Sequence, residues 1–415
     1  MRIFILALDS ADFKTINHIE GLSNLQTIKQ EGVWAPMRST IPPISGPAWV
    51  SMFSGVGPEV HGIYDFLIRK DEQFNFELID SSHVKVKRVW EYLAENGLKC
   101  ISVNTMVTYP VDRENNRGNI FITGGLTPPD ADDYIWPEDV KREIEEKFGH
   151  YPVSARGGFA LRKGDEARFI ERIFANTRKR IEITKYLLER KEWDCCIHLI
   201  EGLDSFHHEF APVLLEGDPE NEIYKKYVEY WHLIDEYIGY LMGLDDVNLF
   251  IVSDHGFRAC DKNVLVNNFL IRNGFLTFKR NLSTLVKRLI FNPYINLYTM
   301  YRFASKIFDV SRIKNKLLET QEGGDTVGKL FLSKHNLDLE GSTAYSEGTY
   351  GQIYLIDPGR EQEVIDALGR MEHGGKRIVQ NIYRGKEIYP HGVGFPPDIV
   401  FDTVEGYIPH QRSAG

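Results

Sequence analysis

The sequence predicts an α/β protein with a mostly parallel central sheet and helices on both faces. Four short apolar runs have the length and composition of strands, at residues 3–8, 99–103, 195–200 and 249–252. Longer segments of mixed polarity separate them, and strands that alternate with helical segments form parallel sheets covered on both faces. Residues 224–241 place apolar side chains at helical spacing, which predicts an amphipathic helix leading into the fourth strand.

The C-terminal third interrupts this pattern. Residues 279–316 carry nine Lys or Arg against a single acid, Asp309, interleaved with aromatic and aliphatic side chains. Such a segment is typical of an inserted helical cap, although a solvated helical hairpin has the same composition. After it, we expect a strand at 352–355, a helix at 362–368 and a strand at 398–401.

These elements predict three parts of the chain. We expect an α/β core over residues 1–275, a basic helical cap over 276–330, and a return to the core or a small α/β lobe over 331–415. The length permits either one large domain with insertions or two domains.

The overall charge restricts the class of partner. The 415 residues contain 59 Asp or Glu against 49 Lys or Arg, a formal net charge of −10. Because such a surface repels a phosphate backbone, binding to a nucleic-acid duplex is not expected. The sequence does not determine the oligomeric state.

Two features predict a cytoplasmic location. The first apolar run is shorter than a signal-peptide core and ends at Asp9, and nowhere do eighteen apolar residues follow one another. The four cysteines show no metal-ligand spacing, and the neighbours Cys195 and Cys196 are hard to bridge without strain. We therefore expect buried thiols in a reducing compartment.

Acidic residues end or follow three of the predicted strands. Asp9 ends the first, Asp204 follows the third, and Asp254 with His255 ends the fourth. Since ligands of open α/β sheets gather outside the carboxyl edge, these residues predict a metal site there. Each aspartate alone would be interpreted as a helix N-cap. Carboxylate and imidazole ligands suit zinc, manganese or iron better than calcium.

Asp204 and His208 stand four residues apart. If a helix begins at Ser205, both side chains point to one face and can hold one ion. His207 also offers a nitrogen, but on that helix it points about 100° away from His208. We expect His207 to lie behind the ligands or at the surface, and its replacement by alanine to have little effect.

Ser45 lies in a Pro/Gly-rich turn within residues 40–49 (TIPPISGPAW), just before a helix expected to begin at Pro47 or Ala48. A hydroxyl there is held rigidly, and the N–H groups of the helix could receive an anion. A metal-bound serine loses its proton more readily and can attack as an alkoxide. Without the metal ligands, Ser45 would be interpreted as an ordinary N-cap serine.

These motifs follow one another in a characteristic order. They are Asp9 after the first strand, residues 45–49 (SGPAW) with 54–62 (SGVGPEVHG), Asp204 with His208, and residues 253–256 (SDHG). In this order they resemble the type I phosphodiesterase/nucleotide pyrophosphatase family, in its archaeal and bacterial form, within the alkaline-phosphatase superfamily. Asn104 with residues 108–110 (TYP), and residues 345–360, also resemble that family, so the resemblance covers most of the chain except the basic insertion.

The resemblance implies an alkaline-phosphatase-like fold, two divalent cations and a small phosphate-ester substrate. Carried over, one metal site is formed by Asp9, Ser45, Asp254 and His255, and part of the other by Asp204 and His208. Zinc is the expected metal, with manganese or iron as alternatives. Ser45 is the implied nucleophile of a covalent phosphoseryl mechanism, and Asn104 or backbone N–H groups near Gly46 are expected to steady the phosphate oxygens.

A further histidine usually completes the second site in that family, after a run that corresponds here to residues 397–400 (PDIV). His410 is the one histidine in the tail after this run, and His391 precedes it. Either could substitute, or water could complete the site. The interpretation we favour is that the family's element lies beyond residue 415.

Several related functions compete with hydrolysis. A sulfatase needs an arginine at the position of Trp49, which argues against it. A phosphomutase or a phosphoethanolamine-type transferase would use the same metals and a hydroxyl nucleophile. A catalytically silent metal-binding or lipid-surface-binding protein would lack one ligand of the second site. The basic insertion could select among mono- and diesters or rest on an anionic membrane surface.

Overall fold

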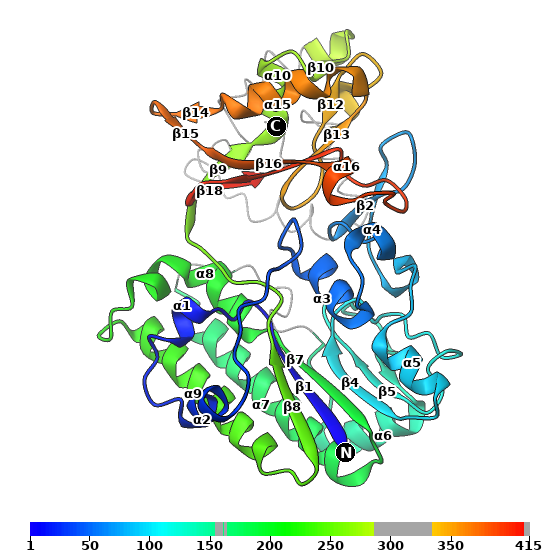
Figure 1. Cartoon of the computed structure of the whole chain (residues 1–415), viewed down its shortest axis with the longest axis vertical. Helices are drawn as coiled ribbons and strands as arrows, with labels where there is room; N and C mark the ends of the chain where they lie inside the picture. Colours follow the sequence, from blue (N-terminus) through cyan, green and yellow to red (C-terminus); the bar gives the residue numbers. More distant parts are fainter. Residues whose placement is uncertain (154–160, 162–163, 286–333, 411–415) are drawn as a thin grey trace, which may run out of the picture. The chain divides into compact units, whose positions relative to one another are not determined.

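The computed structural model describes residues 1–153, 161, 164–285 and 334–410 of the chain (Figure 1). The chain divides into two compact units. Unit 1 comprises Met1–Ala259 and Gly392–Phe395, and unit 2 comprises Cys260–His391 and Pro396–Gly415.

Residues 260–275 belong to unit 2, whereas we expected the core to extend to residue 275. The reason is a pairing between distant segments, because β9 (Cys260–Leu265) runs parallel to β18 (Gly406–His410). The helix α10 (Val266–Arg272) follows β9 directly. Because of this pairing, the first segment of unit 1 ends at Ala259. Local composition does not reveal a pairing between segments so far apart.

Unit 1 is built on a six-stranded sheet in the order β6-β5-β4-β7-β1-β8. The strands are β1 (Arg2–Leu8), β4 (Cys100–Thr105), β5 (Ile120–Thr123), β6 (Ile135–Trp136), β7 (Cys195–Ile200) and β8 (Val247–Val252). All neighbours are parallel except β5 and β6, which are antiparallel. The expected mostly parallel sheet is confirmed, and the four predicted strands, which are β1, β4, β7 and β8, lie within two residues of their expected positions.

Helices cover both faces of this sheet (Figure 1). One face packs against α2 (Ser23–Glu31), α6 (Glu138–Phe148), α7 (Glu166–Arg190), α8 (Gly202–Glu216) and α9 (Glu222–Met242). The other packs against α3 (Ser45–Ser54) and α5 (Val89–Glu95). Phe4 and Leu6 of β1 join the first core and Ala7 joins the second. Side chains of a strand alternate between faces, so a strand buried on both sides must be apolar throughout.

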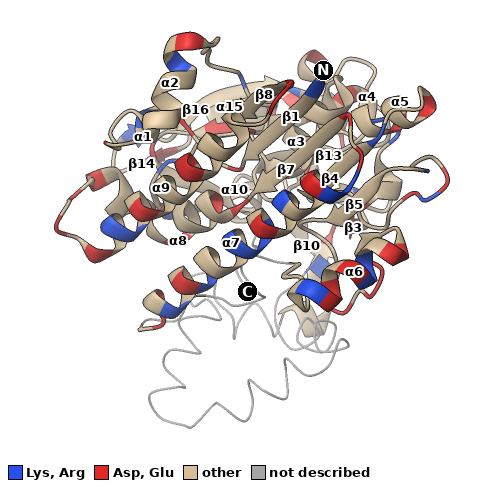
Figure 2. Cartoon of the chain, turned by 90° about the horizontal axis from the view of Figure 1, so that it is seen from below, with Lys and Arg blue, Asp and Glu red and all other residues tan. Residues whose placement is uncertain are grey.

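The outer helices carry mixed charges. Lys and Arg alternate with Asp and Glu along α6 and α7 (Figure 2). The apolar positions of α7, including Ile173 and Leu187, face the core instead. Both helices therefore have the amphipathic pattern of a surface helix.

Smaller elements complete unit 1. These are α1 (Phe13–Ile16), α4 (Pro58–His61), a turn of 3₁₀ helix (Ser81–His83) and a hairpin of β2 (Leu67–Arg69) with β3 (Phe76–Leu78). The returning segment Gly392–Phe395 joins them, because the Val393 N–H donates to the Glu59 carbonyl at 2.9 Å and the Tyr64 hydroxyl donates to the Val393 carbonyl at 2.9 Å.

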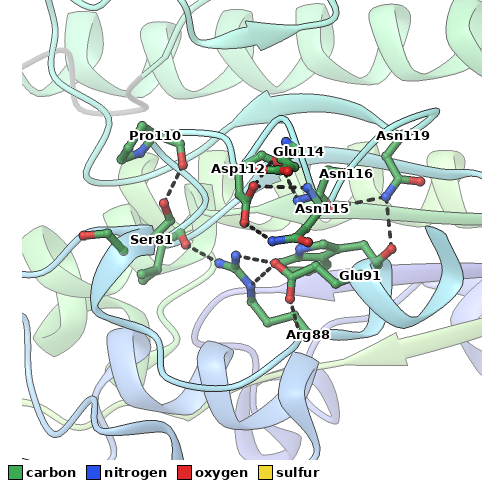
Figure 3. A network of polar contacts seen from close by, with 12 residues as sticks. Ser81, Arg88, Glu91, Pro110, Asp112, Glu114, Asn115, Asn116 and Asn119 are labelled. Carbon is green, nitrogen blue, oxygen red and sulfur yellow. Dashed lines mark hydrogen bonds and ion pairs between the residues drawn. The ribbon is translucent and has the colours of Figure 1, made fainter. Parts of the chain in front are cut away.

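A buried ion pair fixes the start of α5 (Figure 3). The Arg88 guanidinium donates to Glu91 Oε1 from Nη2 at 2.7 Å, and to the Val107 carbonyl from Nη1 at 3.0 Å. Both ionised side chains are less than a tenth exposed. The pair thereby ties α5 to the loop that follows β4.

Replacing Glu91 by glutamine is expected to destabilise unit 1 by about 3 kcal/mol, because Arg88 would stay buried without a counter-charge. The double variant Arg88→Met/Glu91→Leu removes both charges and is expected to recover most of the loss. Urea unfolding followed by tryptophan fluorescence measures both. If the double variant were as unstable as the single one, an uncompensated buried charge on Arg88 would not explain the loss of stability.

Unit 2 contains a four-stranded antiparallel sheet in the order β12-β13-β17-β16. Its strands are β12 (Ala344–Tyr345), β13 (Gly351–Leu355), β16 (Val379–Arg384) and β17 (Ile399–Thr403). β13, β17 and the helix α15 (Glu361–Gly369) confirm the three elements expected after the insertion. Shorter elements are β10 (Thr277–Phe278) with β11 (Leu337–Asp338), β14 (Glu372–His373) with β15 (Lys376–Arg377), and α16 (Gly385–Ile388).

The described residues of the expected part 331–415 belong to unit 2 together with residues 260–285, except for Gly392–Phe395. Most of the basic insertion lies outside the described residues, which stop at 285 and resume at 334. Within the described part of the chain, no helix has both the length and the apolar character that a membrane span requires.

Candidate functional site

The predicted ligands of unit 1 gather at the carboxyl edge of the six-stranded sheet. Asp9 directly follows β1, and Asp254 follows β8, the neighbouring strand. Ser45 is the first residue of α3. Because β1 and β8 are parallel neighbours, their carboxyl ends meet at the same edge and bring the two aspartates together.

Four of the predicted side chains come into close contact. His255 Nε2 lies 2.9 Å from Ser45 Oγ, 3.3 Å from Asp254 Oδ2 and 3.7 Å from Asp9 Oδ1. Ligand atoms of Asp9, Asp254 and His255 all lie within 4.8 Å of one another. Within the described residues, these three form the one group of three or more side chains with the donors and spacing of a metal site.

The two carboxylates are buried, and each has an oxygen with no hydrogen-bond donor. Asp9 is 2% exposed and Asp254 is 3% exposed. Asp9 Oδ1 and Asp254 Oδ2 accept no hydrogen bond, although burial of such an oxygen is costly unless something compensates it. Both oxygens face His255 Nε2.

The pKa values of the two aspartates also favour a cation site. Burial raises the pKa of Asp9 well above its usual value, and the negative charges of Asp254 and Asp204 raise it further. Burial also raises the pKa of Asp254, against the opposing effect of His255. A divalent cation would compensate both carboxylates, and the donor set of two carboxylates, an imidazole and a hydroxyl fits such an ion.

Asp204 and His208 lie on α8, one turn apart, as expected. His208 Nε2 is 3.3 Å from Asp204 Oδ1, and their side chains are 59% and 20% exposed respectively. The negative charge of Asp204 raises the pKa of both Asp9 and Asp254. The helix begins at Gly202 rather than at Ser205, so both residues are fully within it.

His207 is buried, so the expectation that it could lie at the surface is wrong. It is 4% exposed, and its ring stacks on Phe257 at 3.6 Å with an interplanar angle of 8°. Nδ1 lies 2.8 Å from Ser10 Oγ, and Nε2 lies 2.8 Å from the Tyr227 hydroxyl. Burial holds the pKa of His207 well below its usual value, so the imidazole is neutral. Its replacement by alanine would leave a polar cavity, which argues against the expectation of little effect.

Asn104, expected to steady phosphate oxygens, is the penultimate residue of β4, in a fully buried position with φ of 59°. Its side-chain amide donates to the Leu199 carbonyl of β7 at 2.9 Å, while Oδ1 accepts no hydrogen bond. The observed contact ties two neighbouring strands together at the edge that carries the candidate site.

The turn before α3 is packed tightly around Ser45. Ile44 is extended, and the helix begins at Ser45, two residues earlier than the expected start at Pro47. A Cβ on Gly46 would lie only 3.2 Å from Ile79 Cδ1, so glycine suits the close packing. Ser45 itself is 8% exposed, so the packed turn surrounds it on most sides.

Two contacts of the site were not expected from the sequence. The Trp49 indole N–H donates to Asp9 Oδ2 at 3.2 Å, and the Ser10 N–H donates to Asp254 Oδ1 at 3.1 Å. Trp49 stands four residues after Ser45 on the same helix, and this spacing could have revealed it. For Ser10, its place next to Asp9 was the available signal.

The histidines considered for the second site lie elsewhere in the chain. His391 and His410 both belong to unit 2, His410 as the last residue of β18 and His391 with φ of 60°. Completion of that site by either one stays a prediction.

The chain matches a known protein family over most of its length. The family model described as type I phosphodiesterase / nucleotide pyrophosphatase matches residues 3–376. None of the curated proteins searched matches the chain.

Two kinds of solved structure share the fold. Phosphonoacetate hydrolase from Sinorhizobium meliloti 1021 matches with a TM-score of 0.58 and 15% identity, covering 99% of this chain and 82% of that one. Murine ectonucleotide pyrophosphatase/phosphodiesterase 5 matches with a TM-score of 0.50 and 13% identity, covering 99% of this chain and 81% of that one. At these identities the likeness establishes the fold, which is the alkaline-phosphatase-like α/β fold that the sequence predicted.

Proposed function

Because the chain belongs to the type I phosphodiesterase/nucleotide pyrophosphatase family, we propose that it hydrolyses phosphate esters through a covalent intermediate on Ser45. In this proposal Asp9, Ser45, Asp254 and His255 bind one divalent cation, and Asp204 with His208 binds a second. Zinc is the metal we favour, since carboxylate and imidazole ligands suit it.

The observation that carries the proposal is the pair of buried carboxylate oxygens without donors. Asp9 Oδ1 and Asp254 Oδ2 flank His255 Nε2, which in turn lies 2.9 Å from Ser45 Oγ. A hydroxyl, an imidazole and two carboxylates that each have one oxygen without a donor are what a cation-assisted nucleophile requires.

The chemistry needs two displacements at phosphorus. In the first, Ser45 Oγ loses its proton and forms a bond to phosphorus while the ester oxygen leaves. In the second, a water oxygen bonds to phosphorus, the Oγ–P bond breaks and Ser45 regains its proton. The bound cations supply charge that lowers the pKa of the attacking hydroxyl and stabilises the leaving oxygen.

The chain's own groups do the positioning. Ser45 opens α3, whose first N–H groups have no acceptor inside the helix and can donate to phosphate oxygens. Trp49 holds one oxygen of Asp9, and Ser10 holds one oxygen of Asp254. Each carboxylate is thereby oriented with its other oxygen toward the candidate cation. Positioning charge against charge is most of what phosphoryl transfer requires of a protein.

The test is release of nitrophenol from mono- and bis-nitrophenyl phosphate by protein stripped with a chelator and reloaded with zinc, manganese or magnesium. We expect turnover that depends on the added metal. Comparing nitrophenol with inorganic phosphate from the monoester, in the presence of an alcohol acceptor, separates hydrolysis from transfer. Absence of turnover of either ester with every metal would contradict the proposal and favour a silent metal-binding protein.

A further inference from the structure

We propose that His207 is a positioning residue that fixes Ser10, and through Ser10 aligns the carboxylates of Asp9 and Asp254 for cation binding. The inference rests on the metal-dependent function proposed above. It adds to that site a side chain that holds the ligands in place from behind.

The imidazole of His207 is held on three sides. Ser10 Oγ lies 2.8 Å from Nδ1, the Tyr227 hydroxyl lies 2.8 Å from Nε2, and Phe257 stacks on the ring face at 3.6 Å. With 4% of its surface exposed, the residue is shielded from water that would compete for these contacts.

The hydrogen bonds around His207 can run in one direction throughout. The Ser10 hydroxyl donates to the Gly256 carbonyl at 3.3 Å. In the tautomer with a proton on Nδ1, Ser10 Oγ accepts from His207, and Nε2 accepts from the Tyr227 hydroxyl. The second partner of a ring nitrogen generally fixes the tautomer, and Tyr227 is that partner here.

Ser10 joins the two aspartates of the site. It directly follows Asp9, its N–H donates to Asp254 Oδ1 at 3.1 Å, and its hydroxyl bonds to Gly256, two residues after Asp254. Its φ is 66°, a conformation that residues other than glycine rarely adopt. The two contacts of the hydroxyl hold the residue in that conformation. Without them, the N–H would turn away from Asp254 and the backbone carrying Asp9 would change direction.

The alternative is that His207 only fills the core, and the chain contains a matched control for it. His198 of β7 is also buried, and its Nδ1 lies 3.0 Å from the hydroxyl of Tyr237, a tyrosine of the same helix α9. Within the described residues, the side-chain contacts of His198 are with Thr184 and Tyr237, and not with Ser10, Asp9 or Asp254.

The experiment replaces His207 by phenylalanine, which keeps the stacked ring and removes both hydrogen bonds. Cobalt(II) is titrated into chelator-stripped protein, and its visible absorption reports affinity and ligand geometry. We expect cobalt affinity to fall by about 10- to 100-fold with a changed spectrum. The His198→Phe control is expected to lower the melting temperature while its cobalt affinity and spectrum match the wild type.

A double-mutant cycle tests whether His207 acts through Ser10. Ser10→Gly removes the hydroxyl and accepts the positive φ, so adding His207→Phe to it is expected to weaken cobalt binding no further. If the two effects multiply, or if His207→Phe alone binds cobalt like the wild type, the inference is wrong. Should His207→Phe not fold, Tyr227→Phe and Ser10→Ala each remove one hydroxyl of the same chain of contacts and are expected to shift the spectrum in the same direction.

The readout separates this inference from the proposed function. Wild-type protein that binds cobalt tightly but cleaves no phosphate ester would contradict the function and leave the positioning role supported by the cobalt data. Conversely, full phosphoesterase activity with unchanged cobalt binding in His207→Phe would contradict the positioning role alone.

Discussion

Replacing Ser45 by alanine is expected to lower turnover of phosphate esters by at least about 10³-fold while the protein keeps its metal. The loss is large because the attacking atom is removed, whereas the carboxylates and imidazole around it remain. Ser45 Oγ is the hydroxyl that contacts His255 Nε2, at 2.9 Å. Initial rates with nitrophenyl phosphates and elemental analysis of the same preparation measure both quantities.

Two matched variants sharpen this test. Ser45→Thr keeps a hydroxyl at the same position and should retain much of the activity. Ser54→Ala removes a hydroxyl from the same helix, where it only bonds the Val50 carbonyl at 2.7 Å, and should change nothing. Acid quenching during turnover, followed by mass spectrometry, should locate a phosphoryl group on Ser45. Unchanged turnover in Ser45→Ala would exclude the covalent route and leave direct attack by water.

Replacing Asp254 by asparagine is expected to remove most of the bound metal and, with it, nearly all turnover. The amide can still accept the Ser10 N–H through its oxygen, so the local hydrogen bond is kept. What is lost is the charged oxygen, Oδ2, which has no hydrogen-bond donor and faces His255. Elemental analysis and nitrophenol release test the expectation together.

The fold of the metal-free Asp254→Asn protein should survive. Burial raises the pKa of Asp254 above its usual value near 3.8, so the folded state binds the proton more tightly than the unfolded chain does. Stability of the metal-free wild type therefore falls as pH rises above that value, and at neutral pH the ionised carboxylate is unfavourable. The variant lacks this penalty, and its melting temperature in chelator at pH 7 should be at least that of the wild type.

Asp235 is the control for burial alone. It is 5% exposed and accepts hydrogen bonds from Leu25 at 2.8 Å and from Asn24, neither of which is a candidate ligand. Asp235→Asn should lower the melting temperature but keep the metal. If both aspartate variants lost metal equally, unfolding and not ligand loss would explain the result for Asp254.

Local patterns were sufficient to predict four of the six strands of the sheet in unit 1, but not β5 and β6. The apolar runs at 3–8 and 195–200 correspond to β1 (Arg2–Leu8) and β7 (Cys195–Ile200), because strands covered on both faces must be apolar at every position. The periodic segment at 224–241 lies within α9 (Glu222–Met242). A helix buried on one face needs an apolar residue every three to four positions, and the segment has that spacing.

The grouping of the candidate ligands also followed from the sequence. Asp9 and Asp254 each follow an apolar run, and parallel strands place their carboxyl ends at one edge, so the sequence predicts both carboxylates at that edge. Their closeness depends on β1 and β8 being neighbours, which the structure shows. The ordered motifs, including Ser45 and residues 253–256, were specific enough to indicate the family that the match over residues 3–376 establishes.

Only the tertiary structure shows which side chains contact each candidate site residue. Helical spacing correctly turned His207 away from His208, but only the packing of α8 against Tyr227 and Phe257 shows that this direction leads into the core and to Ser10. Likewise, the pairing of β9 with β18 moved the end of the core to Ala259. Periodicity gives the angle of a side chain around its own element, whereas its partner comes from segments distant in the chain, and those contacts form only when the chain folds.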